Sequence, residues 1–398
     1  MKKNLLFVIP SLSAGGGEKS LINLLTQIDF EKYQVDLLLF NRSGEFISLL
    51  PKQVNIIKLN QDYELFSKNL FLSLKGFILK KQVSLAYSRL LFTILSRVIL
   101  DKAKSEQYAW KYVQQSINSL EKNYDAAIGY LEKSSIYFVV EKVKAKKKIG
   151  WIHTNYLNSG MDEKIDRSFF QHLDHLVTVS KECADSLKIK FKPMTNKIEV
   201  IYNIVSPQTV RSLANQNVSD RYNQAENRKK IITVARLSPE KGIDLAVKAC
   251  KILVEKGHRI QWIVLGEGSE RDKLELMIKE LNLNNHFFLA GVKKNPYPYM
   301  KDADIYVQPS RYEGKSIAID EAKILAKPIV VTDFDSAKDQ IIHEVNGLIV
   351  EKDEQGIAKG IDKLLRDTLF KQSLSKNLQM EKLGTEEEIQ KLYTLIEW

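Results

Sequence analysis

Cysteine is scarce in this chain of 398 residues, which contains only Cys183 and Cys250. Neither lies in a C-x-x-C pair or in a cluster with histidine, so the sequence offers no material for a disulfide framework or a structural zinc site. We therefore expect the protein to work in a reducing compartment and assign it to the cytoplasm.

Long hydrophobic runs are also missing. No stretch reaches the roughly 18 uninterrupted apolar residues that a membrane-spanning helix needs, because Lys and Arg recur through the most hydrophobic region. The amino-terminal MKKNLLFVIPSL has an apolar run that stops at Pro10 before a glycine loop, which indicates a buried first strand rather than a signal peptide. These features predict a protein that is not secreted and does not cross a bilayer.

Acidic residues are too few to balance the basic ones, and the formal net charge is +11. Residues 68–104 carry eight Lys or Arg interleaved with Leu, Phe and Ile, a pattern typical of one or two helices lying on an anionic membrane surface. An equally acceptable interpretation is a pair of helices that packs its apolar stripe on a domain core. The aromatic residues fall on the apolar stripe rather than forming a stacking platform, so we expect no nucleic-acid partner.

Short apolar runs alternate with helical patterns along the whole chain. This alternation predicts an α/β protein with parallel sheets and helices on both faces. The expected strands are 5–9, 35–40, 54–59, 126–130, 148–153 and 176–179 in the first half, then 231–234, 260–265, 287–290, 305–308, 329–331 and 348–350.

A polar stretch that begins at Ser206 indicates the domain boundary. We expect a Rossmann-like domain over 1–205, a linker over 206–229, a second Rossmann-like domain over 230–384, and a helix over 385–398 that returns to the first domain. Two doubly wound domains would bring the carboxyl ends of both sheets to a shared cleft, where such sheets bind ligands.

The segment PSRYEGKSIAIDEAKILAKPIVVT, which starts at Pro309, carries the clearest chemical pattern. Gly314 permits a tight turn, and the apolar spacing after it predicts a helix that starts near Ser316. Free backbone N–H groups at that helix start would bind a diphosphate. Glu313 precedes the helix and Glu321 lies inside it, so one carboxylate can reach a sugar and the other a ribose.

A second segment, VARLSPEKG, places two cations at another helix start. Ser238 is a plausible N-cap with Pro239 at the first helical position, so Lys241 falls in the first turn and Arg236 lies just before it. Two fixed cations can offset the charge that develops on a leaving diphosphate, a role that a divalent metal can also fill. We therefore predict neither a metal nor a further cofactor.

Two glycine turns follow expected strands. Gly15, Gly16 and Gly17 follow the first strand, and Gly266 and Gly268 follow 260–265. Glycines of this kind let a phosphate or sugar approach the backbone closely, although a plain structural turn explains them too. They do not form G-x-G-x-x-G, so a dinucleotide site is disfavoured.

Together these motifs resemble the retaining glycosyltransferases of family 4, which have the GT-B fold. The likeness rests on the E-x7-E spacing of Glu313 and Glu321, the RLSPEKG loop, the GEG turn, and the segments SAGGGEKSL, TVSKECADSL and VIYNIV. It covers nearly the whole chain and extends to bacterial enzymes of capsular and cell-surface polysaccharide synthesis.

The resemblance implies a role for each candidate residue. It places Arg236 and Lys241 on the diphosphate and Glu321 on the nucleotide ribose. It places Glu313 and the backbone of Gly314, Lys315, Ser316 and Ile317 on the donor sugar, and His153 of IGWIHTNY near the transferred group. The implied catalytic residues are Arg236, Lys241, Glu313 and His153, and the donor-binding residues include Gly16, Gly17, Gly266 and Gly268.

Two segments depart from the family pattern and leave the donor sugar open. Lys315 and Ser316 replace a common aromatic and small pair, and Asp333–Gln340 replaces a common Gly-Gly. The family retains anomeric configuration, and no side chain here is an obvious covalent nucleophile, so the resemblance favours departure and attack on one face of the sugar.

We expect a hexosyltransferase that uses a UDP-sugar and a polyprenyl-diphosphate-linked or polysaccharide acceptor at the inner face of the cell membrane. The second domain would bind the donor and the first the acceptor. A nucleotide-sugar epimerase of the same architecture is the alternative enzyme. A catalytically silent scaffold that docks on membranes is the alternative from another class.

Overall fold

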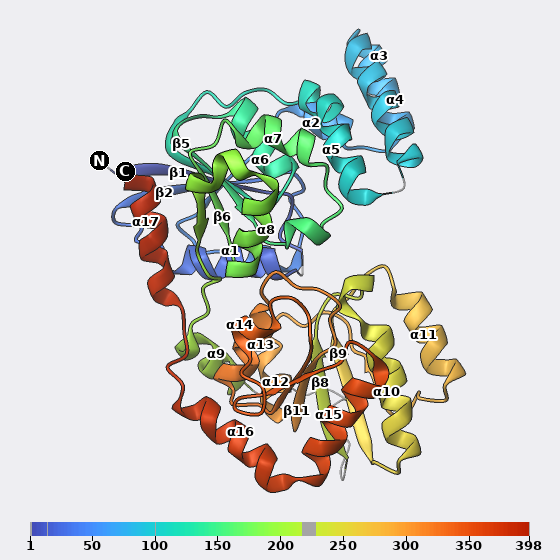
Figure 1. Ribbon diagram of the computed structural model, residues 1–398. Helices are drawn as coiled ribbons and strands as arrows, with labels where there is room; N and C mark the ends of the chain where they lie inside the picture. Colours follow the sequence, from blue (N-terminus) through green and yellow to red (C-terminus); the bar gives the residue numbers. More distant parts are fainter. Residues whose placement is uncertain (1, 14, 100, 217–227, 398) are drawn as a thin grey trace. The chain divides into compact units, whose positions relative to one another are not determined.

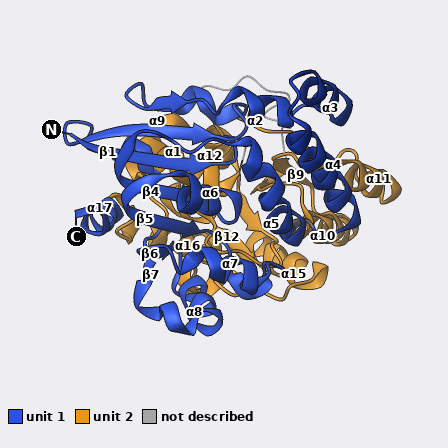
Figure 2. Cartoon of the chain, turned by 90° about the horizontal axis from the view of Figure 1, so that it is seen from above, with its two compact units in different colours: residues 1–13, 24–202, 388–398 blue, residues 14–23, 203–387 orange. Residues whose placement is uncertain are grey.

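The computed structural model describes residues 2–13, 15–99, 101–216 and 228–397. Its chain divides into two compact units (Figure 2). Unit 1 comprises residues 1–13, 24–202 and 388–398, and unit 2 comprises 14–23 and 203–387, within the described ranges. Each unit is built on its own parallel sheet, so the predicted α/β class with two Rossmann-like domains is confirmed.

Unit 1 contains a seven-stranded sheet in the order β3-β2-β1-β4-β5-β6-β7. Its central strands are almost wholly buried because helices cover both faces, which is why their sequences are continuous apolar runs. The strands are β1 Lys3–Ile9, β2 Tyr33–Leu39, β3 Asn55–Ile57, β4 Asn123–Tyr130, β5 Lys144–Ile152, β6 His175–Thr178 and β7 Ile198–Val200. The first six match the predicted strands to within a few residues, and β7 was missed.

The helices that belong to unit 1 include the carboxyl-terminal one. They are α2 Gln61–Phe66, α3 Leu70–Leu79, α4 Val83–Val98, α5 Lys102–Val113, α6 Ser134–Lys142, α7 Glu163–Phe170, α8 Lys181–Lys190 and α17 Ile389–Glu397. Tyr393 of α17 stacks on Tyr33 with ring centroids 4.9 Å apart. Its hydroxyl also accepts the backbone N–H of Asp29 at 2.8 Å, which fixes α17 beside the start of β2.

Unit 2 contains a six-stranded sheet in the order β10-β9-β8-β11-β12-β13. The strands are β8 Lys229–Val234, β9 Ile260–Leu265, β10 Phe287–Leu289, β11 Ile305–Gln308, β12 Ile329–Thr332 and β13 Leu348–Val350, all at the predicted positions. Its helices are α9 Pro207–Ala214, α10 Ile243–Glu255, α11 Arg271–Glu280, α12 Tyr297–Asp302, α13 Ile317–Ile324, α14 Ala337–Gln340, α15 Glu354–Arg366 and α16 Thr368–Met380.

Two segments near the domain boundary join unit 2. Helix α9 lies in the segment expected as a linker, yet Val210 and Ala214 are buried in the same hydrophobic cluster as Tyr297 and Met300. Residues 217–227 of that expected linker lie outside the described residues. Helix α1, Gly16–Thr26, contributes its first turns, where the Ser20 hydroxyl donates to Asn203 Oδ1 at 2.6 Å.

Both sheets have a strand order that reverses beside the first strand of the unit. In unit 2 the chain runs outward from β8 to β9 and β10, then returns to β11 on the other side of β8. In unit 1 the reversal lies between β1 and β4. The carboxyl ends of the strands at such a point leave a crevice for ligands, so the loops after β8 and β11 are where a site is expected.

Candidate functional site

The loops that follow β8, β9 and β11 form one connected layer at the carboxyl edge of the unit 2 sheet. The backbone N–H of Leu237, after β8, donates to Glu267 O, after β9, at 2.9 Å. On the other side, Arg311 N, after β11, donates to Glu240 O at 2.8 Å. These bonds bring together the two segments that sequence patterns assigned to a diphosphate and a sugar.

Lys241 and Glu313 form an ion pair at the centre of this layer. The Lys241 ammonium lies 2.6 Å from Glu313 Oε2, and both side chains are largely buried. Glu313 Oε1 accepts the Ser310 hydroxyl at 2.7 Å and the Gln308 amide at 3.1 Å. Since both carboxylate oxygens are engaged, Glu313 is held in one orientation toward the ammonium.

Arg236, by contrast, is exposed and loosely held. Its guanidinium lies 3.7 Å from Glu240 Oε1. Burial raises the pKa of Glu240, but the Ser238 hydrogen bond and the charges of Arg236 and Lys241 outweigh it, so the pKa lies below its usual value. Arg236 is therefore a cation that can turn toward an incoming anion at little cost.

The helix start predicted at Pro239 is wrong by four residues. Pro239–Lys241 form a single 3-10 turn, and α10 begins at Ile243. Gly242 separates them with a φ of +64°, and a Cβ at Gly242 would lie 2.0 Å from Pro309 O. The close approach of the 309–313 loop therefore requires glycine at 242 and explains why the helix cannot run through.

Arg311 fixes the loop after β11 and was not singled out from the sequence. Its guanidinium donates to both carboxylate oxygens of Asp244 at 2.8 and 2.7 Å and to Pro239 O at 2.7 Å. Burial raises the pKa of Asp244, but the hydrogen bonds and charge of Arg311 lower it below its usual value. Such a two-pronged pair ties α10 to the loop that carries Glu313.

The start of α13 lies where the apolar spacing predicted it, with Ser316 at the N-cap. The buried side chain of Gln340 accepts the Ser316 N–H at 2.9 Å, and its amide donates to Ser316 O at 2.7 Å and to Asp320 at 2.9 Å. Ser336 donates to Glu313 O at 3.1 Å. The segment that departs from the family pattern, 333–340, thus holds the proposed donor loop in place.

The other residues of the 314–317 segment offer a ligand mainly their backbone. Gly314 is buried, and the Ile317 side chain lies in the hydrophobic core. Lys315 is largely buried with its ammonium 3.6 Å from Asp320. The Ser316 N–H is already bonded to Gln340, so it is less available to the donor sugar than the resemblance implies.

Glu321 lies deeper than the other candidate residues and is almost fully buried. Its Oε1 accepts the Tyr297 hydroxyl at 2.8 Å and lies 2.5 Å from the ammonium of Lys19 in α1. Burial and the neighbouring carboxylate raise the pKa of Tyr297 well above its usual value, so the phenol keeps its proton and donates it. Lys19 was not predicted, although it follows the predicted Gly16 and Gly17 within the first turn of α1.

The glycines divide into two kinds. A Cβ at Gly266 would lie 1.9 Å from Ala235 O, and a Cβ at Gly268 would lie 2.2 Å from Leu237 O. Packing of the two neighbouring loops is therefore enough to explain both. A Cβ at Gly16 would meet nothing within 4 Å, so packing gives no reason for glycine there.

His153 belongs to unit 1, where it follows β5. Its Nε2 is buried without a hydrogen-bond partner, and its ring packs on Tyr130 at 4.8 Å between centroids. Burial lowers the pKa of His153 to about 3, so the ring is neutral at physiological pH. A neutral imidazole can accept or donate a hydrogen bond to a sugar hydroxyl without carrying charge.

Glu132 holds the loop that carries His153 and was missed by sequence reasoning. Its carboxylate accepts the backbone N–H groups of His153 and Thr154, the latter at 3.0 Å. The residues on either side of it, Leu131 and Lys133, have φ values of 139° and 63°. Strained backbone of this kind clusters at functional sites, and it follows β4 at the reversal point of the unit 1 sheet.

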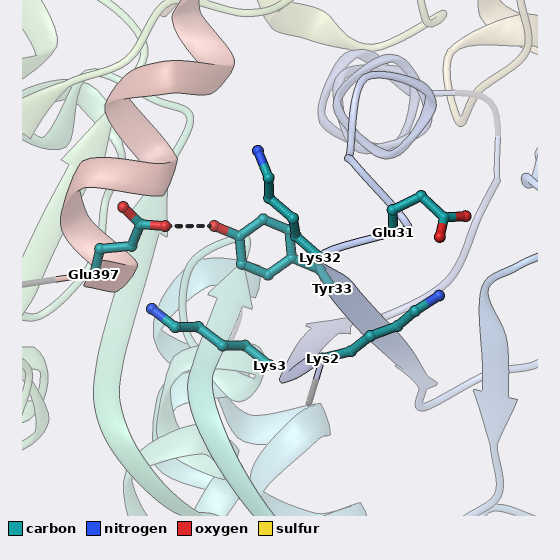
Figure 3. A pocket seen from close by; sticks show the side chains of 6 residues that line it. All are labelled: Lys2, Lys3, Glu31, Lys32, Tyr33 and Glu397. Carbon is teal, nitrogen blue, oxygen red and sulfur yellow. Dashed lines mark hydrogen bonds between the residues drawn. The ribbon is translucent and has the colours of Figure 1, made fainter.

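Among the described residues, neither a metal cluster nor the pocket of unit 1 competes with this site. Across the described ranges of the chain, no three His, Cys, Asp or Glu side chains gather as a metal site would require; the absence of a metal in the reaction stays a prediction. An open pocket in unit 1 is lined by Lys2, Lys3, Glu31, Lys32, Tyr33 and Glu397 (Figure 3). It lies where β1 and β2 begin, at the amino edge of the sheet, away from the edge where such sheets bind ligands.

Residues 215–380 match the family described as "Glycosyl transferases group 1", so this part of the chain carries a domain of that family. A Campylobacter jejuni protein named N-acetylgalactosamine-N,N'-diacetylbacillosaminyl-diphospho-undecaprenol 4-alpha-N-acetylgalactosaminyltransferase is 28% identical over 54% of this chain and 56% of its own. The capsular polysaccharide biosynthesis glycosyltransferase CapM of Staphylococcus aureus is 27% identical over 42% of this chain and 44% of its own.

Similarity to solved structures extends over the whole chain. Anabaena HepE in complex with UDP and glucose superposes with a TM-score of 0.71 and 17% identity, over 99% of both chains. At that identity the likeness establishes the two-domain GT-B fold. In sequence, the chain spans about half the length of the curated relatives it matches. The family domain includes every candidate residue of unit 2 except Gly16 and Gly17.

Proposed function

We propose that this protein is a glycosyltransferase that moves a hexose from a nucleoside-diphosphate sugar, with UDP as the nucleotide, to an acceptor of bacterial surface polysaccharide synthesis. The observation that carries the proposal is the group formed by Arg236, Lys241, Glu313 and the start of α13 at the reversal point of the unit 2 sheet. The glycosyltransferase family domain covers the same residues.

The cations act on the leaving group. As the bond between the anomeric carbon and the diphosphate oxygen breaks, negative charge collects on UDP, and Lys241 and Arg236 stabilise it. Glu313 keeps the Lys241 ammonium at the carboxyl edge through a 2.6 Å contact. Preorganised charge of this kind contributes about 3–4 kcal/mol to lowering the barrier. We propose that these two side chains replace a metal ion.

Retention follows if the new bond forms on the face from which the diphosphate departs. The anomeric carbon loses its bond to the diphosphate oxygen and gains a bond to the acceptor oxygen, while the acceptor proton passes to the departing phosphate. Glu313 is poorly placed to act as a covalent nucleophile, because its two carboxylate oxygens are held by Lys241, Ser310 and Gln308.

The helical hairpin of α3 and α4 supports a lipid-linked acceptor at a membrane. Figure 1 shows the two helices as a pair that projects from the rest of unit 1. Of the nineteen large hydrophobic side chains that are exposed in the described part of the chain, nine lie here: Phe71, Leu72, Ile78, Leu79, Val83, Tyr87, Leu90, Ile94 and Val98. The spacing of the five on α4 places them along one face of that helix.

The same segment also packs on unit 1, as the alternative interpretation expects. Phe77 of α3 and Ala86 of α4 are buried and pack with Phe66 in a small hydrophobic cluster, so the hairpin is anchored to unit 1. Residues 65–100 contain no Asp or Glu, and Lys75 and Arg97 are exposed beside the apolar face. The carboxylate of Asp62 beside the hairpin is paired with Lys80. An exposed apolar face flanked by Lys75 and Arg97 complements an anionic lipid surface, and we propose that it docks there.

Vesicle flotation tests the docking. We expect the protein to float with vesicles of anionic phospholipid and to bind neutral vesicles more weakly. Val83→Glu should abolish flotation, whereas Leu369→Glu, at an equally exposed site in unit 2, should leave it unchanged. If the two variants float equally well, the hairpin of α3 and α4 is not the membrane-docking surface. No helix in the described ranges is both long and apolar enough to span the bilayer.

Release of UDP tests the reaction itself. With a panel of UDP-sugars and lipid-linked acceptors, we expect UDP to accumulate only when the right donor and acceptor are both present. Arg236→Ala should lower turnover by about a hundredfold or more, because one leaving-group cation is lost. UDP release that is independent of any acceptor, or unchanged turnover in the variant, would refute the assignment.

A further inference from the structure

One oxygen of the Glu321 carboxylate, Oε1, already has two side-chain partners. This oxygen is 2.5 Å from the Lys19 ammonium, which also lies 4.6 Å from the centre of the Tyr297 ring. The Glu321 side chain is only 1% exposed, whereas Lys19 is 21% exposed. The ammonium therefore covers the carboxylate and is the part of the pair that solvent or a ligand reaches first.

This contact conflicts with free access of a nucleotide ribose to Glu321. Ribose hydroxyls can donate hydrogen bonds to a buried carboxylate only if they reach its oxygens. Oε1 is already held by both Lys19 and the Tyr297 hydroxyl, and the Lys19 ammonium is the partner on the solvent side of the carboxylate. Resting on the proposed function, and on the family resemblance that puts the nucleotide ribose at Glu321, we propose that Lys19 is an affinity-determining residue: its ammonium must leave Glu321 before the ribose hydroxyls bind.

The position of Lys19 allows its ammonium to leave Glu321 without a rearrangement of the backbone. Lys19 is in the first turn of α1, two residues after Gly17, and its long side chain is partly in solvent. Glu321 is in α13 and retains the Tyr297 hydroxyl bond when the ammonium departs. The buried carboxylate then exchanges one charged donor for two neutral hydroxyl donors and is never left without a partner.

The same arrangement predicts what happens when the ammonium is removed. In Lys19→Met the carboxylate keeps only Tyr297 as a side-chain donor, so the free protein is raised in energy and the ribose meets no competitor. We expect UDP to bind roughly tenfold more tightly, the scale of one charge-assisted hydrogen bond. A nucleotide that lacks the 2′ and 3′ hydroxyls cannot donate to the uncovered carboxylate, so its affinity should not change.

Isothermal titration calorimetry with UDP and 2′,3′-dideoxy-UDP tests this. The full-length wild type, Lys19→Met and Lys230→Met are compared. Lys230 is a matched control because its side chain is about as buried as that of Lys19 and is also paired with a carboxylate, that of Asp302. It lies in β8 at the amino edge of the unit 2 sheet, away from the proposed site. We expect tighter binding only of UDP, and only by Lys19→Met.

Three results would overturn the proposal: unchanged or weaker UDP binding in Lys19→Met, an equal gain for the dideoxy nucleotide, or an equal gain in Lys230→Met. Should Lys19→Met fail to fold, Lys19→Gln serves instead, since its amide can still donate to Glu321 and should give a smaller gain. Failure of the proposed function would look different, because the wild type itself would then bind no UDP.

Discussion

Removal of Lys241 should cost stability as well as activity, whereas removal of Arg236 should cost activity alone. The Lys241–Glu313 pair is 2.6 Å long and its side chains are 17% and 7% exposed. Taking away one partner of a buried pair leaves an uncompensated charge, so Lys241→Ala should lower the free energy of unfolding by about 3–5 kcal/mol. The side chain of Arg236 is 55% exposed and lies 3.7 Å from Glu240, so Arg236→Ala should change the free energy of unfolding by less than about 1 kcal/mol.

Urea unfolding followed by circular dichroism measures this difference. A double variant, Lys241→Met with Glu313→Gln, removes both charges and should recover most of the lost stability, because no buried charge is left unpaired. Equal stability of the Lys241 and Arg236 single variants, or a double variant no more stable than Lys241→Ala, would refute the buried pair. Arg236→Ala is consequently the cleaner test of catalysis.

Three further predictions follow from individual contacts. Gln340→Leu should lower the free energy of unfolding by about 1–3 kcal/mol, measured by urea titration, because the buried Ser316 N–H loses its acceptor. Gly268→Ala should lower the melting temperature, because the added Cβ would overlap the backbone of Leu237. Gly16→Ala should leave the melting temperature unchanged, because its Cβ would meet nothing. If the donor contacts the Gly16 turn, this second variant should also weaken UDP binding. Burial lowers the pKa of His153 to about 3, so between pH 6.5 and pH 3 the unfolded state alone gains this proton. The free energy of unfolding should therefore fall by about 1.4 kcal/mol for each pH unit over that range, and His153→Asn should flatten the slope.

The sheets could be predicted because their strands are buried on both faces. Runs such as LLFVI in β1 and IQWIVL in β9 have no polar alternation, and helical patterns separate them. Strand β7 has only three residues, Ile198–Val200, and one of them is an exposed glutamate, so no apolar run marks it. Its position is set by pairing with β6.

The candidate site could be predicted in part, from residues that follow strands. Glu313 and Lys241 were recognisable because each lies in a turn after a buried strand, next to a predicted helix start. The residues that hold them were not recognisable. Arg311 and Gln340 act through geometry between segments distant in the sequence, Arg311 with Asp244 and Gln340 with Ser316.

Local helix chemistry also misled the sequence interpretation at one point. Ser238 and Pro239 have the composition of a helix start, but the Ser238 hydroxyl bonds to the Glu240 side chain at 2.5 Å instead of capping the backbone. The approach of Pro309 then forces Gly242 into a left-handed conformation. A tertiary contact therefore overrode the local helix signal, and no sequence pattern within residues 236–242 predicts that contact.

A structure of the protein with UDP bound tests the central claim most directly. We predict the diphosphate within hydrogen-bonding distance of Arg236 and Lys241, and the ribose hydroxyls on Glu321 with the Lys19 ammonium displaced from that carboxylate. UDP bound away from the carboxyl edge of the unit 2 sheet, with the Lys241–Glu313 and Lys19–Glu321 pairs undisturbed and no phosphate contact to either cation, would contradict the account.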